Sequence, residues 1–151
     1  MVVTRAMALT GEYAEEKAGW VKDQLAKIDE TGTTDSVGVA GQAVVVFTYR
    51  GRKSGKLYRR PLMRVEHDGV YAAVASKGGA PQHPTWYYSF LGDPEIDVLD
   101  GTVTTSGVAR EISGAERDEW WERAVAAYPP YAEYQTKTDR LIPIFLIEPA
   151  K

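Results

Sequence analysis

Hydrophobic and polar positions alternate with different periods along the chain, which predicts a mixture of helices and strands. Residues 13–29 place apolar side chains on one side at helical spacing, which predicts an amphipathic helix. Its apolar positions are Trp20, Val21, Leu25 and Ile28. Residues 31–42 are rich in Gly, Thr and Ser, as is typical of a loop. Residues 43–49 form a β-branched run that is too short for a typical helix and predicts a buried strand.

Two pairs of strand-like segments are each joined by an Asp-Gly dipeptide. Residues 62–66 and 70–76 flank Asp68-Gly69, and residues 95–99 and 102–110 flank Asp100-Gly101. Asp-Gly tolerates the positive φ angles of two-residue hairpin turns, so each pair predicts a β-hairpin. The apolar run at residues 142–148 predicts a closing strand.

A helix is predicted between the second hairpin and the closing strand. Ser113 and Glu116 have the spacing of a capping box, and Pro129-Pro130 predicts a break. Successive hairpins favour an antiparallel sheet, and about six strands in a chain of 151 residues fit a small barrel better than a doubly wound parallel sheet. We therefore expect one α+β, mainly β, domain over residues 1–151.

Composition narrows the function. The net charge of −3 and the pI of 5.4 argue against general nucleic-acid binding, and the absence of cysteine excludes disulfides and thiol nucleophiles. The chain shows neither a signal peptide nor a membrane-length apolar run, so we expect a cytoplasmic protein.

Against this acidic background, five cations fall within nine residues: Arg52, Lys53, Lys56, Arg59 and Arg60. Gly51 and Gly55 permit tight turns that can direct N–H groups at an anion, and the guanidinium fork suits phosphate or carboxylate. The alternative interpretation is a solvated strand edge. The stretch lacks the spacing of a phosphate-binding P-loop, His67 and His83 do not form a metal-binding pair, and no GxSxG motif is present.

Two further segments combine polar groups with planar aromatics. In residues 75–88, Lys77 follows a predicted strand, Gly78-Gly79 allows close approach of another molecule, and His83-Pro84 predicts the start of a short helix. In residues 128–134, tyrosines recur at every third position, where on a helix they would share a broad face. Such a stripe can equally be ordinary core.

Taken together and in order, these motifs resemble the deazaflavin-dependent nitroreductase family of actinobacteria, whose members use coenzyme F-420. The resemblance covers roughly residues 40–149. It rests on Gly51-Arg52-Lys53-Ser54-Gly55, Pro61-Leu62, Ala75-Ser76-Lys77-Gly78-Gly79-Ala80, His83-Pro84 with Trp86-Tyr87, Tyr128-Pro129-Pro130-Tyr131, Tyr134-Gln135, Asp139-Arg140 and Ile142-Pro143. It implies a split β-barrel that holds the deazaflavin in a groove.

The resemblance also implies roles for particular residues. The cofactor would meet Arg52, Lys53, Ser54, Lys56, Arg60, Pro61, Leu62, Met63, Val74, Ala75, Ser76, Lys77, Gly78, Trp86, Tyr87 and Ser89. The acceptor pocket would be lined by Ser76, Tyr128, Tyr131 and Tyr134, with Tyr131 and Tyr134 as the catalytic candidates. The chain departs from the family at Tyr58, where an arginine is frequent. Arg59 or Arg60 can replace that arginine, but neighbouring residues of a strand face opposite sides, so only one of them can easily do so.

The implied activity is hydride transfer from reduced F-420 to an electron-poor small molecule such as a quinone, a nitro compound or an activated enone. The cofactor carries the chemistry, so neither a nucleophile nor a metal is required. Two alternatives stay open: an F-420 carrier without catalysis, and a barrel enzyme that uses flavin mononucleotide. Contact with the inner face of the plasma membrane is expected only if the acceptor is a lipid quinone, and the sequence leaves the oligomeric state open.

Overall fold

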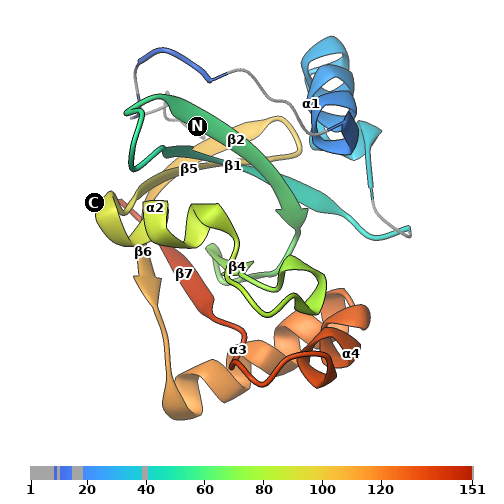
Figure 1. Ribbon diagram of the computed structural model, residues 1–151. Coiled ribbons are helices and arrows are strands. Elements are labelled where there is room, and N and C mark those ends of the chain that lie inside the picture. The colour runs from blue at the N-terminus through green and yellow to red at the C-terminus, as the bar shows by residue number, and fades with distance from the viewer. Residues whose placement is uncertain (1–8, 10, 15–18, 39–40, 151) are drawn as a thin grey trace.

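One antiparallel sheet curls around the interior of the protein (Figure 1). The computed structural model describes residues 9, 11–14, 19–38 and 41–150. The strands are β1 Val44–Arg50, β2 Leu57–Met63, β3 Glu66–His67, β4 Val70–Val74, β5 Glu95–Asp100, β6 Val103–Glu111 and β7 Ile144–Pro149. They lie in the order β2-β1-β5-β6-β7-β4-β3 and pair antiparallel throughout. The predicted antiparallel split barrel is confirmed, with seven strands in place of about six.

The strand after the cationic stretch begins earlier than the sequence predicts. β2 starts at Leu57 and pairs with β1 from Arg50↔Leu57 to Val44↔Met63, so the loop between them is only residues 51–56. The start of β2 was not predicted because it carries charged residues, which are typical of a loop. They occur in this strand because β2 lies at the edge of the sheet, where several of its residues are partly exposed. Pro61 is tolerated within it for the same reason, since an edge strand need not donate every N–H.

Four α-helices cover the sheet (Figure 1): α1 Gly19–Thr31, α2 Thr85–Gly92, α3 Gly114–Ala127 and α4 Pro130–Thr136. Two short 3₁₀ turns occur at Thr34–Ser36 (η1) and Lys77–Gly79 (η2). The predicted first helix, residues 13–29, is wrong at its start. Tyr13 instead forms a bridge to Leu57, and residues 15–18 of that prediction lie outside the described residues.

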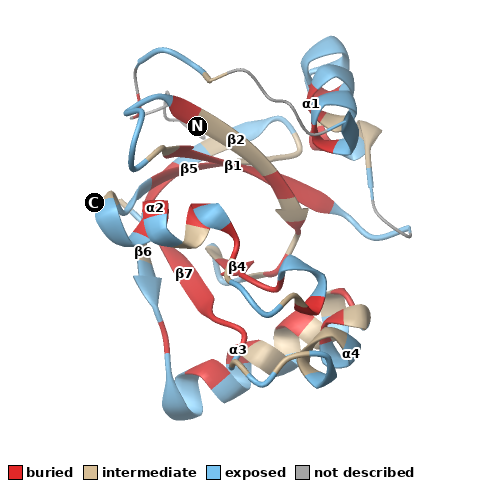
Figure 2. Ribbon diagram, in the orientation of Figure 1, coloured by how far each residue is buried: buried red, intermediate tan, exposed pale blue. Residues whose placement is uncertain are grey.

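The strand β1 is buried on both faces, which makes it the centre of the fold (Figure 2). Val45 and Phe47 pack with α2 in the interior of the curl, whereas Val46 packs with Val21 and Leu25 of α1 on the other side. A strand covered on both faces carries a nearly continuous apolar run, as residues 43–49 do with Thr48 as the single polar residue.

The helices α3 and α4 close the end of the sheet near β4 and β7. The helix α3 begins after Ser113, as predicted, but the capping box is wrong because the Ser113 side chain makes no capping hydrogen bond. Glu116 instead accepts two hydrogen bonds of 2.9 Å from Arg110 of β6. The predicted helix break at Pro129-Pro130 is confirmed, and α4 starts at Pro130.

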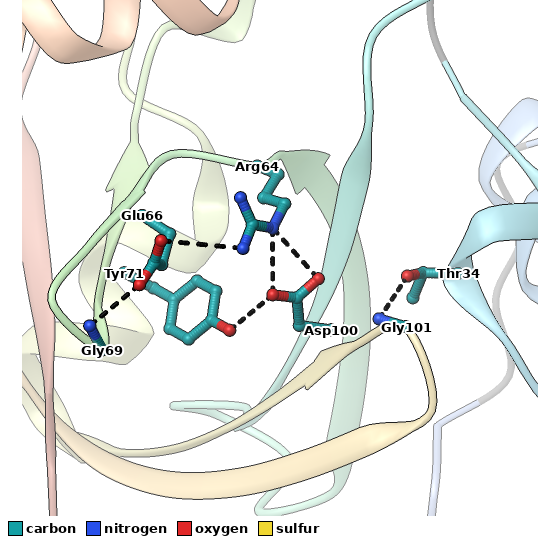
Figure 3. Close-up of polar contacts among 7 residues, drawn as sticks. All are labelled: Thr34, Arg64, Glu66, Gly69, Tyr71, Asp100 and Gly101. Carbon is teal, nitrogen blue, oxygen red and sulfur yellow. Dashed lines mark hydrogen bonds and ion pairs between the residues drawn. The ribbon is translucent and has the colours of Figure 1, made fainter.

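A polar network ties the end of β5 to β4, which is not its neighbour in the sheet, and to Arg64 in the connection between β2 and β3 (Figure 3). Arg64 donates from Nε to both carboxylate oxygens of Asp100, at 3.1 and 2.9 Å, and the hydroxyl of Tyr71 in β4 donates to the same carboxylate at 2.6 Å. Burial and the hydrogen bond to Asp100 raise the pKa of Tyr71 well above its usual range, so the phenol stays a donor. These contacts fix the spacing between β4 and β5.

Candidate functional site

Two adjoining cavities lie between β2, the turn after β4, α2 and the helices α3 and α4. The first, the apolar cavity, has a volume of about 350 Å³. It is lined by Trp20, Gln24, Val44, Arg60, Pro61, Leu62, Met63, Val74, Ser76, Lys77, Gly78, Pro84, Thr85, Trp86, Tyr128, Tyr131 and Tyr134. Most of these side chains are apolar or aromatic, so the cavity suits a flat, largely uncharged group.

The second, the cationic cavity, has a volume of about 610 Å³. It is lined by Tyr49, Gly51, Arg52, Lys53, Ser54, Tyr58, Arg60, Thr85, Tyr88 and Ser89. Arg60 and Thr85 belong to both walls, so the two cavities form one groove with an apolar end and a cationic end.

Most of the residues that the sequence assigns to the site line this groove. Three predicted cofactor-binding residues do not. Lys56 extends to Glu12 with its Nζ 3.9 Å from a carboxylate oxygen, and Ala75 is fully buried. Tyr87 directs its hydroxyl away to Glu111 at 2.9 Å and packs its ring against Phe145.

The loop between β1 and β2 is held in one shape by its own contacts. Gly51 donates to the carbonyl of Lys56 at 2.7 Å, and the Ser54 hydroxyl accepts from the Lys56 N–H at 3.1 Å. A Cβ on Gly51 would lie 2.4 Å from the ring of Tyr58, so only glycine allows this ring to cover the loop. The ring of Tyr58 also stacks on Tyr49 with centroids 5.6 Å apart. Tyr58 is therefore a wall of the cationic cavity.

Arg59 and Arg60 face opposite sides of β2, as strand geometry requires. Arg59 donates two hydrogen bonds, 2.7 and 2.9 Å long, to Asp29 of α1. Arg60 lines the groove, and its buried Nε has no hydrogen-bond partner among the described residues. A buried N–H without an acceptor is costly. Arg60 is therefore the cation of the pair that is available to a bound anion.

Three tyrosines form the end wall of the apolar cavity. Tyr128 is the C-cap of α3 and Tyr131 and Tyr134 lie in α4, so they meet across a helix break rather than along one helix. Their ring centroids are 5.0 to 6.2 Å apart, and the hydroxyls of Tyr128 and Tyr134 share a hydrogen bond of 3.2 Å. That bond and burial raise the pKa of Tyr128 to about 12, while burial raises the pKa of Tyr131 further.

Sequence patterns alone missed several residues of the groove. Thr85 and Tyr88 line the cationic cavity from α2, and the guanidinium of Arg52 lies 5.4 Å from the ring of Tyr88. Trp20 and Gln24 line the apolar cavity from α1. Their spacing of four residues was the one sequence feature that could have indicated a shared face of the helix. That spacing does not reveal which element the helix packs against.

The groove fits a ligand that joins a phosphate-bearing tail to a planar ring. Arg52, Lys53 and Ser54 supply charged and hydroxyl donors at one end, and Arg60 offers its unpaired N–H at the junction.

Among the described residues, no helix is long and apolar enough to cross a membrane.

Comparisons with known proteins assign the chain to a family. The family model for the F420H(2)-dependent quinone reductase matches residues 20–149. A protein of Mycobacterium tuberculosis whose name places it among the F420H(2)-dependent quinone reductases is 30% identical over 105 residues, covering 70% of this chain and 88% of that protein.

Solved structures agree as well. One titled as an F420-H2 dependent reductase (FDR-A) has 56% identity and a TM-score of 0.68, covering 74% of this chain and 99% of the other. Another, titled as a domain-swapped dimer, has 55% identity and a TM-score of 0.70, covering 85% of this chain and 97% of the other. This chain therefore belongs to the F420H(2)-dependent quinone reductase family of deazaflavin-dependent oxidoreductases, for which coenzyme F-420 is the cofactor.

Proposed function

We propose that this protein reduces a small electron-poor acceptor, of which a quinone is the first candidate, with F-420 bound along the groove. The observation that carries the proposal is the junction of an apolar cavity and a cationic cavity at Arg60. One ligand that carries a ring and an anionic tail can occupy both ends. Nitro compounds and activated enones are further candidates, because they offer the same kind of electron-poor centre.

The cationic end would hold the tail of the cofactor. Arg52, Lys53 and Ser54 line this end together on a loop whose shape is fixed by Gly51. Arg52 is held in place by its own N–H, which donates to the Ser89 hydroxyl at 3.3 Å. Lys77, at the edge of the apolar cavity, would face the anionic part from the other side. A preformed set of donors binds an anion without a large ordering cost.

The apolar end would bring the acceptor against the ring. Bound reduced F-420 supplies a hydride, and the acceptor requires a proton separately. Tyr131 is buried, and no hydrogen bond among the described residues uses its hydroxyl. The phenol is protonated at neutral pH, and burial raises its pKa further, so it can donate a hydrogen bond to an oxygen on which negative charge develops.

Trp86 and the tyrosine wall would exclude water from the same end of the groove. Trp86 is 4% exposed and Tyr131 is 3% exposed, so both present packed aromatic surface to the cavity. A dry site strengthens hydrogen bonds to developing charge and limits loss of the hydride to solvent.

Reduced F-420 mixed with the purified protein and a panel of quinones, nitroaromatics and activated enones tests the proposal. We expect the absorbance of oxidised F-420 to reappear with at least one quinone, at a rate proportional to protein concentration. Tight F-420 binding without oxidation by any acceptor would indicate a carrier. Preferential binding of flavin mononucleotide in a parallel titration would assign a different cofactor.

A further inference from the structure

The turn after β4 has a backbone that few L residues adopt. Ser76 is in the right-handed region, with φ −76° and ψ −41°, and Lys77 follows at φ +46° and Gly78 at φ +64°. Right-handed then left-handed residues point successive N–H groups to one side and form a concavity that suits an anion or a carbonyl oxygen. A non-glycine residue at positive φ is strained, so the surrounding structure must hold Lys77 in this conformation.

Hydrogen bonding within the turn is one-sided. No hydrogen bond among the described residues uses the N–H groups of Ser76, Lys77 and Gly78. All three residues line the apolar cavity. The carbonyls of Ser76 and Lys77, by contrast, accept from Gly79 and Ala80 at 3.0 and 3.1 Å. The turn therefore keeps donors free beside the groove and uses its acceptors elsewhere.

Arg140, in the connection between α4 and β7, binds the carbonyl side of this turn. Its guanidinium donates to the carbonyls of Ser76 at 2.7 Å, Ala80 at 2.9 Å and Ala75 at 3.0 Å. One planar fork thus fixes three carbonyls from both ends of the turn. A lysine ammonium cannot reproduce this arrangement, because it is a point charge without a rigid fork.

His83, just before α2, completes the contact. Its Nδ1 lies 3.1 Å from Nη1 of Arg140. Arginine has no acceptor, so Nδ1 must accept the hydrogen bond and the neutral ring must carry its proton on Nε2. The ring is stacked on Tyr87 with centroids 4.3 Å apart, and Tyr87 is anchored by its hydroxyl to Glu111.

We propose that Arg140 and neutral His83 form a clamp that holds the turn at Ser76–Gly78 in the conformation that binds the F-420 ring, which makes Arg140 a positioning residue. The proposal rests on the proposed function only in taking F-420 as the ligand. Neither side chain lines the groove, so both act through the backbone of the turn.

The clamp has a built-in dependence on pH. Protonated His83 cannot accept from Arg140 and would place a second cation 3.1 Å from the guanidinium. The groups that face His83 are Arg140, Glu111, Tyr87 and Tyr88. Burial and then Arg140 lower the pKa of His83, which Glu111 partly opposes. A lowered native pKa means that the clamp is intact above the ordinary pKa of about 6.5 and weakens as pH falls below it.

Three variants test the clamp. Arg140→Lys keeps the charge and removes the fork, and His83→Asn keeps an acceptor near the position of Nδ1 that does not titrate. Arg123→Lys is the matched control, because Arg123 also uses its guanidinium in defined contacts, with Glu119 and with the ring of Trp120, but lies outside the groove. Circular dichroism establishes that each variant is folded.

Two readouts apply: hydrogen exchange of the Gly79 and Ala80 amides in the cofactor-free protein, and the Kd of oxidised F-420 by fluorescence titration. We expect these amides to exchange faster in Arg140→Lys than in the wild-type protein, and at the wild-type rate in His83→Asn and Arg123→Lys. The Kd of Arg140→Lys should be raised roughly tenfold or more, since hydrogen bonds from a charged donor are stronger than those between neutral groups. The ratio of the wild-type Kd to the His83→Asn Kd should rise as pH falls from about 7.5 to about 4.5, a range that extends well below the ordinary histidine pKa of about 6.5. Because both proteins bind the same ligand at each pH, any effect of ligand titration on Kd is the same in both and cancels in the ratio.

Unchanged amide exchange in Arg140→Lys would overturn the clamp, and so would a Kd ratio that stays constant with pH. If the wild-type protein binds no F-420 at any pH, the proposed function fails. The exchange measurement then decides the clamp alone, with faster exchange in Arg140→Lys supporting it and wild-type exchange refuting it.

Discussion

Replacing Gly79 with alanine tests whether close packing between the turn after β4 and α4 sets the shape of the groove. Gly79 has φ +83°, and a Cβ there would lie 2.6 Å from the carbonyl oxygen of Tyr134 and 3.0 Å from Cβ of Lys137. A left-handed backbone costs an L residue about 1–2 kcal/mol. Overpacking against a backbone that cannot yield adds about 1–3 kcal/mol.

These two terms together predict that Gly79→Ala lowers the free energy of unfolding by about 2–5 kcal/mol. Gly78→Ala is the matched control, because Gly78 also has positive φ, at +64°, but no atom lies within 4 Å of the added Cβ. Only the backbone term of about 1–2 kcal/mol applies to it. The difference between the two variants therefore isolates the steric contact with α4.

Urea titration and thermal unfolding, followed by circular dichroism, measure this difference. In a domain of this size each 1 kcal/mol shifts Tm by about 2–4 °C, so Gly79→Ala should lower Tm by roughly 4–20 °C and Gly78→Ala by roughly 2–8 °C. Gly79→Ala should also lower turnover, because the displaced backbone belongs to Tyr134 of the acceptor wall. Equal stability losses in the two variants would refute the reasoning.

Four further predictions test individual residues. Arg60→Ala should raise the Kd for F-420 about tenfold or more. Arg59→Ala removes a salt bridge to Asp29 of α1 and a contact with the ring of Tyr13, both on the other face of β2. It should leave Kd unchanged and lower the unfolding free energy by up to about 1 kcal/mol. Lys77→Gly should weaken F-420 binding in the same titration, because it removes a charge. It should also raise the unfolding free energy by about 1 kcal/mol, because glycine adopts the positive φ of this position without strain. Lys77→Ala should weaken binding equally but should not raise the unfolding free energy. Tyr131→Phe should lower turnover in steady-state assays while leaving the Kd for F-420 nearly intact. Because the pKa of Tyr128 is raised to about 12, the unfolding free energy should fall as pH rises from about 10 toward that value, and Tyr128→Phe should reduce the fall in urea titrations at a series of pH values.

Each of these predictions has an outcome that contradicts it. Equal unfolding free energies in Lys77→Gly and Lys77→Ala would contradict the strain assigned to the backbone of Lys77. Equal effects of Arg59→Ala and Arg60→Ala on Kd would show that the two faces of β2 do not differ as the structure describes. Unchanged turnover in Tyr131→Phe would remove its proposed role. A wild-type slope against pH identical to that of Tyr128→Phe would place the alkaline titration elsewhere.

Local patterns predicted the elements whose chemistry is local. The Asp-Gly dipeptides mark both hairpins. Asp68 and Gly69 form the first turn with φ of +52° and +81°, whereas at the second Asp100 is the last residue of β5 and of the two only Gly101 has positive φ, at +63°. The run at residues 43–49 predicted a buried strand, since it is rich in β-branched and aromatic residues and carries no charge. Element starts were less predictable. Nothing local at residues 57–61 distinguishes a charged edge strand from a charged loop.

The site was predictable in its residue types but not in its contacts. The cationic stretch indicated an anion site, yet pairing with β1 turned Arg59 toward Asp29 and left Arg60 in the groove. The spacing of the three tyrosines indicated a shared face on a helix, and the break at Pro129-Pro130 was predicted as well, but not that the end of one helix and the next helix would bring the three rings together.

The sequence by itself determined that this chain forms an antiparallel sheet of hairpins, with cations gathered in one segment and aromatic residues in two others. Those features follow from turn chemistry, strand periodicity and charge, which act over a few residues. Only the tertiary structure decided that the loop cations meet the tyrosines along one groove, and that Arg140 reaches back to the carbonyls of Ala75, Ser76 and Ala80. Such contacts join residues 60 or more positions apart, and their geometry depends on how the whole sheet curls.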